Sequence, residues 1–222
     1  MLIKKALEFV CECLKSDNSG HDIEHIKRVV ENAKLIIKGE KGADYDVVIL
    51  AAILHDVDDY KLRGSGDNLE KFFKINNVDE KLREKIRVVV ESISFSKSGD
   101  NPNFEMIEQK IVSDADKLDA MGAVGVCRTI LYSASTNRAL FNNEELPKEN
   151  LTKEEYKDKN RKGNHSVNHF FDKLLKLKGA MQTEAGRIEA QKRHDFMVEF
   201  LSEFFREVGA KEEWYNILEK NK

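Results

Sequence analysis

Histidine and aspartate occur here at spacings that could hold a metal ion. His21 and His25 are four residues apart, so on a helix their imidazoles lie on one face, one turn apart. His55 and Asp56 follow thirty positions later, directly after the apolar run 47–54. Imidazole nitrogen and carboxylate oxygen together suit Zn, Mn, Fe, Co or Ni, and carboxylate oxygen also suits Mg. The pattern therefore indicates a candidate divalent metal site.

A third acidic group follows sixty residues further on, where Asp114 and Asp116 stand near the end of another apolar-periodic segment. Each piece has an ordinary explanation by itself: solvated or capping histidines, an imidazole bonded to a carboxylate, and an exposed helix face. A charged pair such as His55 and Asp56 at the end of a core helix is costly unless it is paired or metal-bound. The order of the set, more than any one member, is what points to metal chemistry.

That order, His then His-Asp then Asp, resembles the signature of the HD superfamily of phosphohydrolases. The resemblance covers nearly the whole chain, with residues 141–163 matching least. It implies an all-helical fold and a divalent metal centre. The stretches that carry it are similar to a bacterial subgroup of small HD hydrolases and are 20–29, 54–61, 93–97, 114–123 and 181–205.

Carried over residue by residue, the signature places the metal ligands at His25, His55, Asp56 and Asp116. Asp116 is preferred over Asp114 because the surrounding Ala-Asp-Lys-Leu matches the last motif of the family in that register. A set of four ligands favours one divalent cation over two. Its identity is left open among Mn, Mg, Co, Ni, Fe and Zn, since sites of this kind accept several ions.

An acid or base is expected next to this centre. Asp59 lies one turn after His55, and if the helix continues its carboxylate points towards the metal. The resemblance implies that an acidic residue at this offset orients water or protonates the leaving group. Asp58 is the alternative for the same role.

Three further residues are candidates for substrate contact. Lys61 and Lys97 would meet phosphate as compact positive charges, Lys61 also as part of the catalytic group, with solvated surface charge as an equal alternative. His21 lies outside the four-residue signature. It could contact substrate, bind an additional metal, or support His25.

The expected function is hydrolysis of a nucleotide by a metal-activated water, which needs no Ser or Cys nucleophile. The resemblance favours a nucleoside triphosphate pyrophosphohydrolase or a nucleotide phosphatase. A phosphodiesterase acting on a cyclic or alarmone-type nucleotide is a second possibility. A catalytically silent regulator that binds metal or nucleotide is a third, which the intact signature disfavours.

Other chemically capable residues have structural explanations. His165 and His169 repeat the spacing of four, but no acidic pair accompanies them, so packing is expected. Cys127 is expected in the core, because no base stands beside it. Arg187, Arg193 and His194 share a segment rich in charge, where a solvated face is expected.

Apolar residues recur at helical spacing, and only two prolines interrupt the chain. We expect one all-α domain over residues 1–222, an HD-type helical bundle. Residues 141–163 are very polar and are expected to form an exposed excursion or lid. A dense core helix is expected at 47–54. The helices expected after it cover 67–75, 79–91, 104–117, 120–140, 153–177, 183–208 and 211–218.

The composition excludes several classes of protein. A net charge of −3 and a pI of about 6.1 give no support for a nucleic-acid-binding surface. Three cysteines without paired spacing indicate reduced thiols. No signal peptide or membrane span is visible. A soluble, cytoplasmic protein with a small-molecule nucleotide or phosphate-ester substrate is expected.

Overall fold

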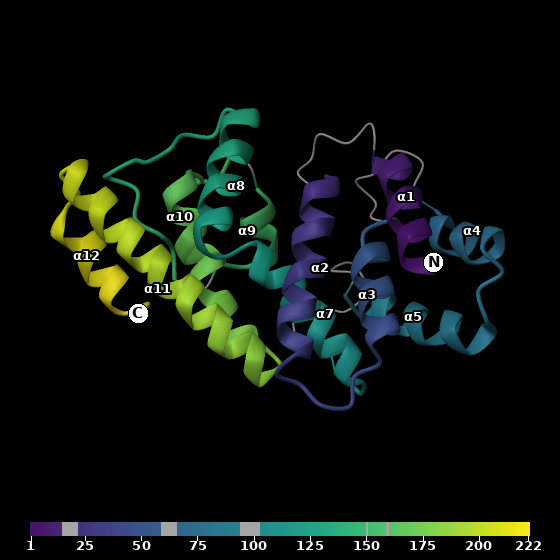
Figure 1. Ribbon diagram of the computed structural model, residues 1–222. Helices are drawn as coiled ribbons and strands as arrows, with labels where there is room; N and C mark the ends of the chain where they lie inside the picture. The colour runs from purple at the N-terminus through teal and green to yellow at the C-terminus, as the bar shows by residue number, and fades with distance from the viewer. Residues whose placement is uncertain (15–21, 59–65, 94–102, 150, 159) are drawn as a thin grey trace. The chain divides into compact units, whose positions relative to one another are not determined.

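The structure is a computed structural model that describes the chain except for residues 15–21, 59–65, 94–102, 150 and 159. Every regular element in the described residues is a helix, so the predicted all-α class is confirmed (Figure 1). The helices form two compact units. The first contains Met1–Asp119 and Gln182–Gly186, and the second contains Ala120–Met181 and Arg187–Lys222.

The first unit is organised around the buried helix α3, Tyr45–Leu54. All side chains from Val47 to Leu54 are buried, because α3 packs against four other helices of the unit. These four helices are α1 (Leu2–Leu14), α2 (Ile23–Ile37), α5 (Glu80–Ile93) and α7 (Ile107–Asp119), and the unit also contains α4 (Asn68–Ile75).

The two ends of α3 determine where the His-Asp pair lies. At its start, the Asp44 side chain accepts a hydrogen bond from the backbone N–H of Val47 at 3.4 Å, as a helix cap does. At its end, α3 stops at Leu54, and His55 begins a turn. A helix whose last eight residues are all buried therefore delivers His55 and Asp56 at the edge of the hydrophobic core.

Helices α2 and α7 pack along one another and supply the other members of the set. The Asp22 carboxylate caps α2 by accepting from the backbone N–H of His25 at 2.8 Å. Further along α2, the buried Asn32 donates its side-chain amide to the carbonyl of Ala115 at 3.0 Å. This bond holds α2 in register with α7 one residue before Asp116.

The start of α11 (Glu184–Glu207) is attached to α7 by Asp114. The buried Asp114 carboxylate accepts from the backbone N–H of Gln182 at 2.9 Å and of Thr183 at 2.8 Å. It also accepts from the Thr183 hydroxyl at 2.7 Å. Asp114 therefore holds the helix start within the first unit.

The second unit has an aromatic core around Trp214. The Trp214 ring centroid lies 5.0 Å from that of Phe141 and 5.4 Å from that of Phe205. Phe141 belongs to the polar segment 141–163, so the start of this segment is packed into the unit. The elements here are α8 (Gly122–Ser135), α9 (Lys153–Lys157), α10 (Ser166–Asp172), the 3-10 helix η1 (Leu174–Ala180), the rest of α11 and α12 (Glu212–Glu219).

In the second unit, the expectations for the helix over 153–177 and for Cys127 are wrong. The single helix over 153–177 is broken, because α9 ends at Lys157 and α10 begins only after Gly163 adopts a left-handed φ of 77°. Cys127 is exposed and not in the core, because the buried face of α8 is formed by Val126, one position round the helix. Within the described residues, no helix has both the length and the apolar character needed to cross a membrane.

Candidate metal centre

Four side chains from three places in the first unit converge on one point. Nε2 of His25 lies 3.5 Å from Oδ2 of Asp56 and 3.5 Å from Oδ1 of Asp116. Nε2 of His55 lies 3.3 Å and 3.8 Å from the same two oxygens. The structure thus brings together the four residues predicted from the signature. Asp114, two positions before Asp116, points instead to the start of α11.

These separations suit ligands that share a cation. Two atoms about 2.1 Å from one ion stand about 3.0 Å apart at a right angle and about 3.4 Å apart at the tetrahedral angle. His25 and His55 are buried, and Asp56 is nearly so, with 14% of its side chain exposed. The Asp116 side chain keeps 38% exposure, so the cluster is open to solvent on that side.

Both imidazoles are oriented through their other ring nitrogen. Nδ1 of His55 donates to the carbonyl of Ala52 at 2.9 Å, and Nδ1 of His25 donates to the carboxylate of Asp119 at 2.7 Å. Each ring therefore presents Nε2 to the cluster. Nε2 of His55 is buried and makes no hydrogen bond to any described residue, which is the behaviour of a nitrogen placed for a metal.

The carboxylates also determine the charge state of the two rings. Burial lowers the pKa of His55, but Asp56 and Asp116 outweigh burial and raise that pKa to about 10. The pKa of His25 is raised in the same way. Burial lowers it, but Asp119, Asp56 and Asp116 outweigh burial. The cluster thus favours positive charge between the rings and the acids. A divalent cation held by these residues would supply that charge in place of the protons.

Asp119 and Arg28 stand behind the cluster, and the sequence interpretation assigned neither a role. Asp119 is 1% exposed and accepts from Arg28 Nε at 2.6 Å and from Arg28 Nη2 at 3.2 Å. The same carboxylate accepts from His25. One signal was present in the sequence: Arg28 follows His25 by three positions, and Asp119 follows Asp116 by three, so each pair shares a helix face.

Most residues predicted to act beside the metal lie outside the described part of the chain: His21, Asp59, Lys61 and Lys97. Asp58 is described, and both of its oxygens are engaged at the start of α4. They accept from the backbone N–H of Asn68 at 2.8 Å and of Leu69 at 3.2 Å. This capping role disfavours Asp58 as an acid or base.

The second histidine pair has the structural roles expected for it. Nδ1 of His165 accepts from the backbone N–H of Asn168 at 3.3 Å and caps α10, while Nε2 donates to the carbonyl of Glu145 at 3.1 Å. His169 stacks on Tyr156, with ring centroids 6.2 Å apart. In the part of the chain that the structure covers, neither histidine joins a group suited to a metal.

The solvated face expected around residues 187–194 is only partly right. Arg193 extends from α11 and pairs with Glu189 at 2.9 Å. His194 is 1% exposed, so the expectation for this residue is wrong. It lies on the buried face of α11 with Met197 and Leu201, which follow at helical spacing and are also buried.

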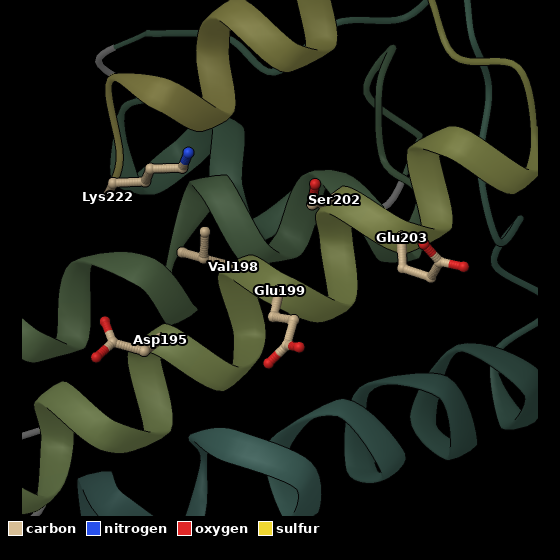
Figure 2. Close-up of a pocket in the computed structure, with 6 residues that line it drawn as sticks. All are labelled: Asp195, Val198, Glu199, Ser202, Glu203 and Lys222. Carbon is tan, nitrogen blue, oxygen red and sulfur yellow. The ribbon is translucent and has the colours of Figure 1, made fainter.

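A separate pocket of about 510 Å³ lies beside α11 in the second unit (Figure 2). Asp195, Glu199 and Glu203 project along one side of the helix, with Lys222 nearby. Asp195 accepts from Gln191 at 2.6 Å, and Glu203 pairs with Arg206. These carboxylates behave as ordinary surface charges of a helix and do not converge as those near His25 do.

The chain is similar in sequence to known proteins. Residues 22–121 match the HD domain family, and this range contains all four converging residues. The chain is 31% identical to the YpgQ protein of Bacillus subtilis over 205 residues, which is 90% of each chain.

Solved structures resemble the chain over nearly its whole length. A Lactobacillus plantarum protein matches with a TM-score of 0.77 and 32% identity over 94% of this chain and 97% of its own. An HD-superfamily hydrolase from Bacillus thuringiensis matches with a TM-score of 0.73 and 32% identity over the same shares. YpgQ in complex with ADP matches with a TM-score of 0.71 and 26% identity over 93% and 97%. The chain therefore belongs to the HD-domain family, with bacterial relatives over most of its length.

Proposed function

We propose that this protein is a metal-dependent phosphohydrolase that acts on a nucleotide, as a nucleoside triphosphate pyrophosphohydrolase or a nucleotide phosphatase. The observation that carries the proposal is the convergence of two Nε2 atoms and two carboxylate oxygens at separations of 3.3–3.8 Å. The nucleotide class is supported by YpgQ, a relative whose structure has been determined with ADP.

In this proposal His25, His55, Asp56 and Asp116 hold one divalent cation. Such a cation, when bound, would supply Lewis-acid chemistry that lowers the pKa of a water and neutralises charge on a phosphoryl oxygen. The protein contributes a buried wall on the imidazole side, because His25 and His55 are buried, and an opening on the side of the half-exposed Asp116. In the part of the chain that the structure describes, the open side is that of Asp116, and a phosphate approaching from there would be restricted in its orientation.

The proton-transfer role is assigned to Asp59 in preference to Asp58, whose oxygens cap α4. Lys61 and Lys97 are proposed to contact substrate phosphate through their ammonium groups. His21 is proposed as a neighbour of the centre that meets substrate. The assignments of Asp59, Lys61, Lys97 and His21 rest on the sequence.

The test is a panel of nucleoside mono-, di- and triphosphates, with cyclic and alarmone-type nucleotides included. Each would be incubated with Mn, Mg, Co, Ni or Zn, and phosphate and pyrophosphate would be measured separately. A metal centre contributes several kcal/mol to such reactions, so His55→Ala and Asp56→Ala should each lose at least about 100-fold in activity. Helical circular dichroism should persist in both variants.

A matched control lies at the opposite end of the same core helix. Asp44→Asn alters the carboxylate that caps α3 and should leave turnover close to that of the wild type. Full activity of His55→Ala in metal-defined buffer would contradict the proposed mechanism. Tight nucleotide binding without turnover under any metal would instead identify a catalytically silent regulator.

A further inference from the structure

Behind the cluster, Arg28, Asp119 and His25 form a chain of hydrogen bonds that ends at Nε2 of His25. We infer that Asp119, held by Arg28, is a positioning residue that fixes the orientation and proton of His25 so that Nε2 is available to the cation. The inference rests on the proposed metal centre and assigns a role to two residues outside the four-residue signature.

The proton between His25 and Asp119 belongs to the His25 ring. An ionised carboxylate only accepts hydrogen bonds, so the 2.7 Å contact requires that Nδ1 of His25 carries the proton. A neutral imidazole holds one proton, and Nε2 is then left with its lone pair. Nε2 is also the atom that lies 3.5 Å from both Asp56 and Asp116.

Arg28 holds the Asp119 carboxylate at two points. Arg28 Nε reaches one of its oxygens at 2.6 Å, and Arg28 Nη2 reaches the other at 3.2 Å. This two-point contact fixes the carboxylate plane as well as its position. Asp119 is 1% exposed, so the carboxylate keeps its charge in the protein interior only with such partners. The guanidinium of Arg28 therefore stabilises the ionised acceptor that His25 needs.

The arrangement of the helices positions these residues. His25 and Arg28 are one turn apart on α2, and Asp116 and Asp119 are one turn apart on α7. The packing of α2 on α7 therefore forms two layers from the same two faces. His25 and Asp116 make the layer at the cation, and Arg28 and Asp119 make the layer that supports it. Outer partners of this kind change metal affinity by about 10- to 100-fold when they are removed.

The experiment is a Mn²⁺ titration of apo protein, with free Mn²⁺ measured by electron paramagnetic resonance. Asp119→Ala removes the acceptor and should weaken Mn²⁺ binding by about 10- to 100-fold. Asp119→Asn keeps an oxygen that can accept from Nδ1 and should fall between Asp119→Ala and wild type. Arg28→Gln should weaken binding by a smaller factor than Asp119→Ala.

Asp114→Asn is the matched control, because Asp114 is a buried carboxylate on the same helix that bonds Gln182 and Thr183. It should lower the melting temperature and leave the Mn²⁺ dissociation constant within threefold of wild type. If Asp119 positions His25, its variants should lose Mn²⁺ affinity, whereas Asp114→Asn should lose stability alone. A merely structural role of Asp119 would not separate the two kinds of loss.

The outcomes are distinct. If wild type binds Mn²⁺ and both Asp119→Asn and Arg28→Gln bind equally well, the positioning role is overturned while the metal centre stands. If wild type binds no divalent cation, the metal centre itself fails. Histidine-labelled protein loaded with Zn²⁺ gives a second readout by nitrogen NMR, with His25→Gln to assign the signal. A proton on Nδ1 of His25 is expected, and a proton on Nε2 would overturn the inference even if Asp119→Ala does not fold.

Discussion

Replacement of Gly186 by alanine tests the attachment of α11 to α7. Gly186 is in the first turn of α11, and its backbone N–H donates to the Thr183 hydroxyl at 3.0 Å. A Cβ atom at this position would lie 2.5 Å from Oδ2 of Asp114 and 2.6 Å from Oγ1 of Thr183. The missing side chain is therefore what allows Asp114 to approach the helix start.

Two effects of opposite sign determine the result. Alanine in a helix is favoured over glycine by up to about 1 kcal/mol. Against this, relief of the overlap costs about 1–3 kcal/mol in a packed interior. Displacement of Asp114 also loses at least one hydrogen bond to a charged group, worth about 1.5–3 kcal/mol. We expect Gly186→Ala to lower the free energy of unfolding by about 2–4 kcal/mol.

The measurement is urea unfolding followed by circular dichroism, with the midpoint and slope compared between proteins. Gly179→Ala is the control, because beyond the adjoining backbone no atom lies within 4 Å of the added Cβ there. It should change stability by no more than about 0.5 kcal/mol. If Gly186→Ala proves as stable as wild type or more stable, helix propensity dominates, and the close approach of Asp114 has no energetic weight.

Two predictions concern the second unit. Trp214 is fully buried among aromatic rings, so Trp214→Ala should cost about 3–5 kcal/mol in urea unfolding, and a loss below about 1 kcal/mol would contradict this packing. Burial, with Lys173, Arg138 and Arg161, lowers the pKa of His169 from 6.5 to about 3, so the folded protein holds it neutral while the unfolded chain binds a proton. The contribution of His169 to the free energy of unfolding should therefore be fully present above pH 6.5 and be lost as the pH falls towards 3. Equal pH dependence of stability in His169→Gln and wild type would refute this role.

The centre of the first unit could be predicted from the sequence because its signals are local. Eight consecutive apolar residues at 47–54 with alanines among them indicate a helix that is buried on all sides, and α3 is such a helix. His55 and Asp56 directly follow it, so their position at the edge of the core follows from chain order. The choice of Asp116 over Asp114 depended on the register of a family motif, and the two carboxylates do point to different partners.

Residues that depend on which face of a helix meets a neighbour could not be assigned in this way. His194 stands among charged residues in sequence, but on α11 it lies on the same buried face as Met197 and Leu201. Cys127 shows the converse, since one step of about 100° round α8 separates it from the buried Val126. The role of Asp119 also depends on the helix face that it occupies. Its role needs a partner ninety-one positions away, and only the packing of α2 on α7 brings Arg28 to its carboxylate. The proposed ligands follow from the order of residues in the chain, whereas the residues that orient them lie on helix faces that meet only in the folded protein.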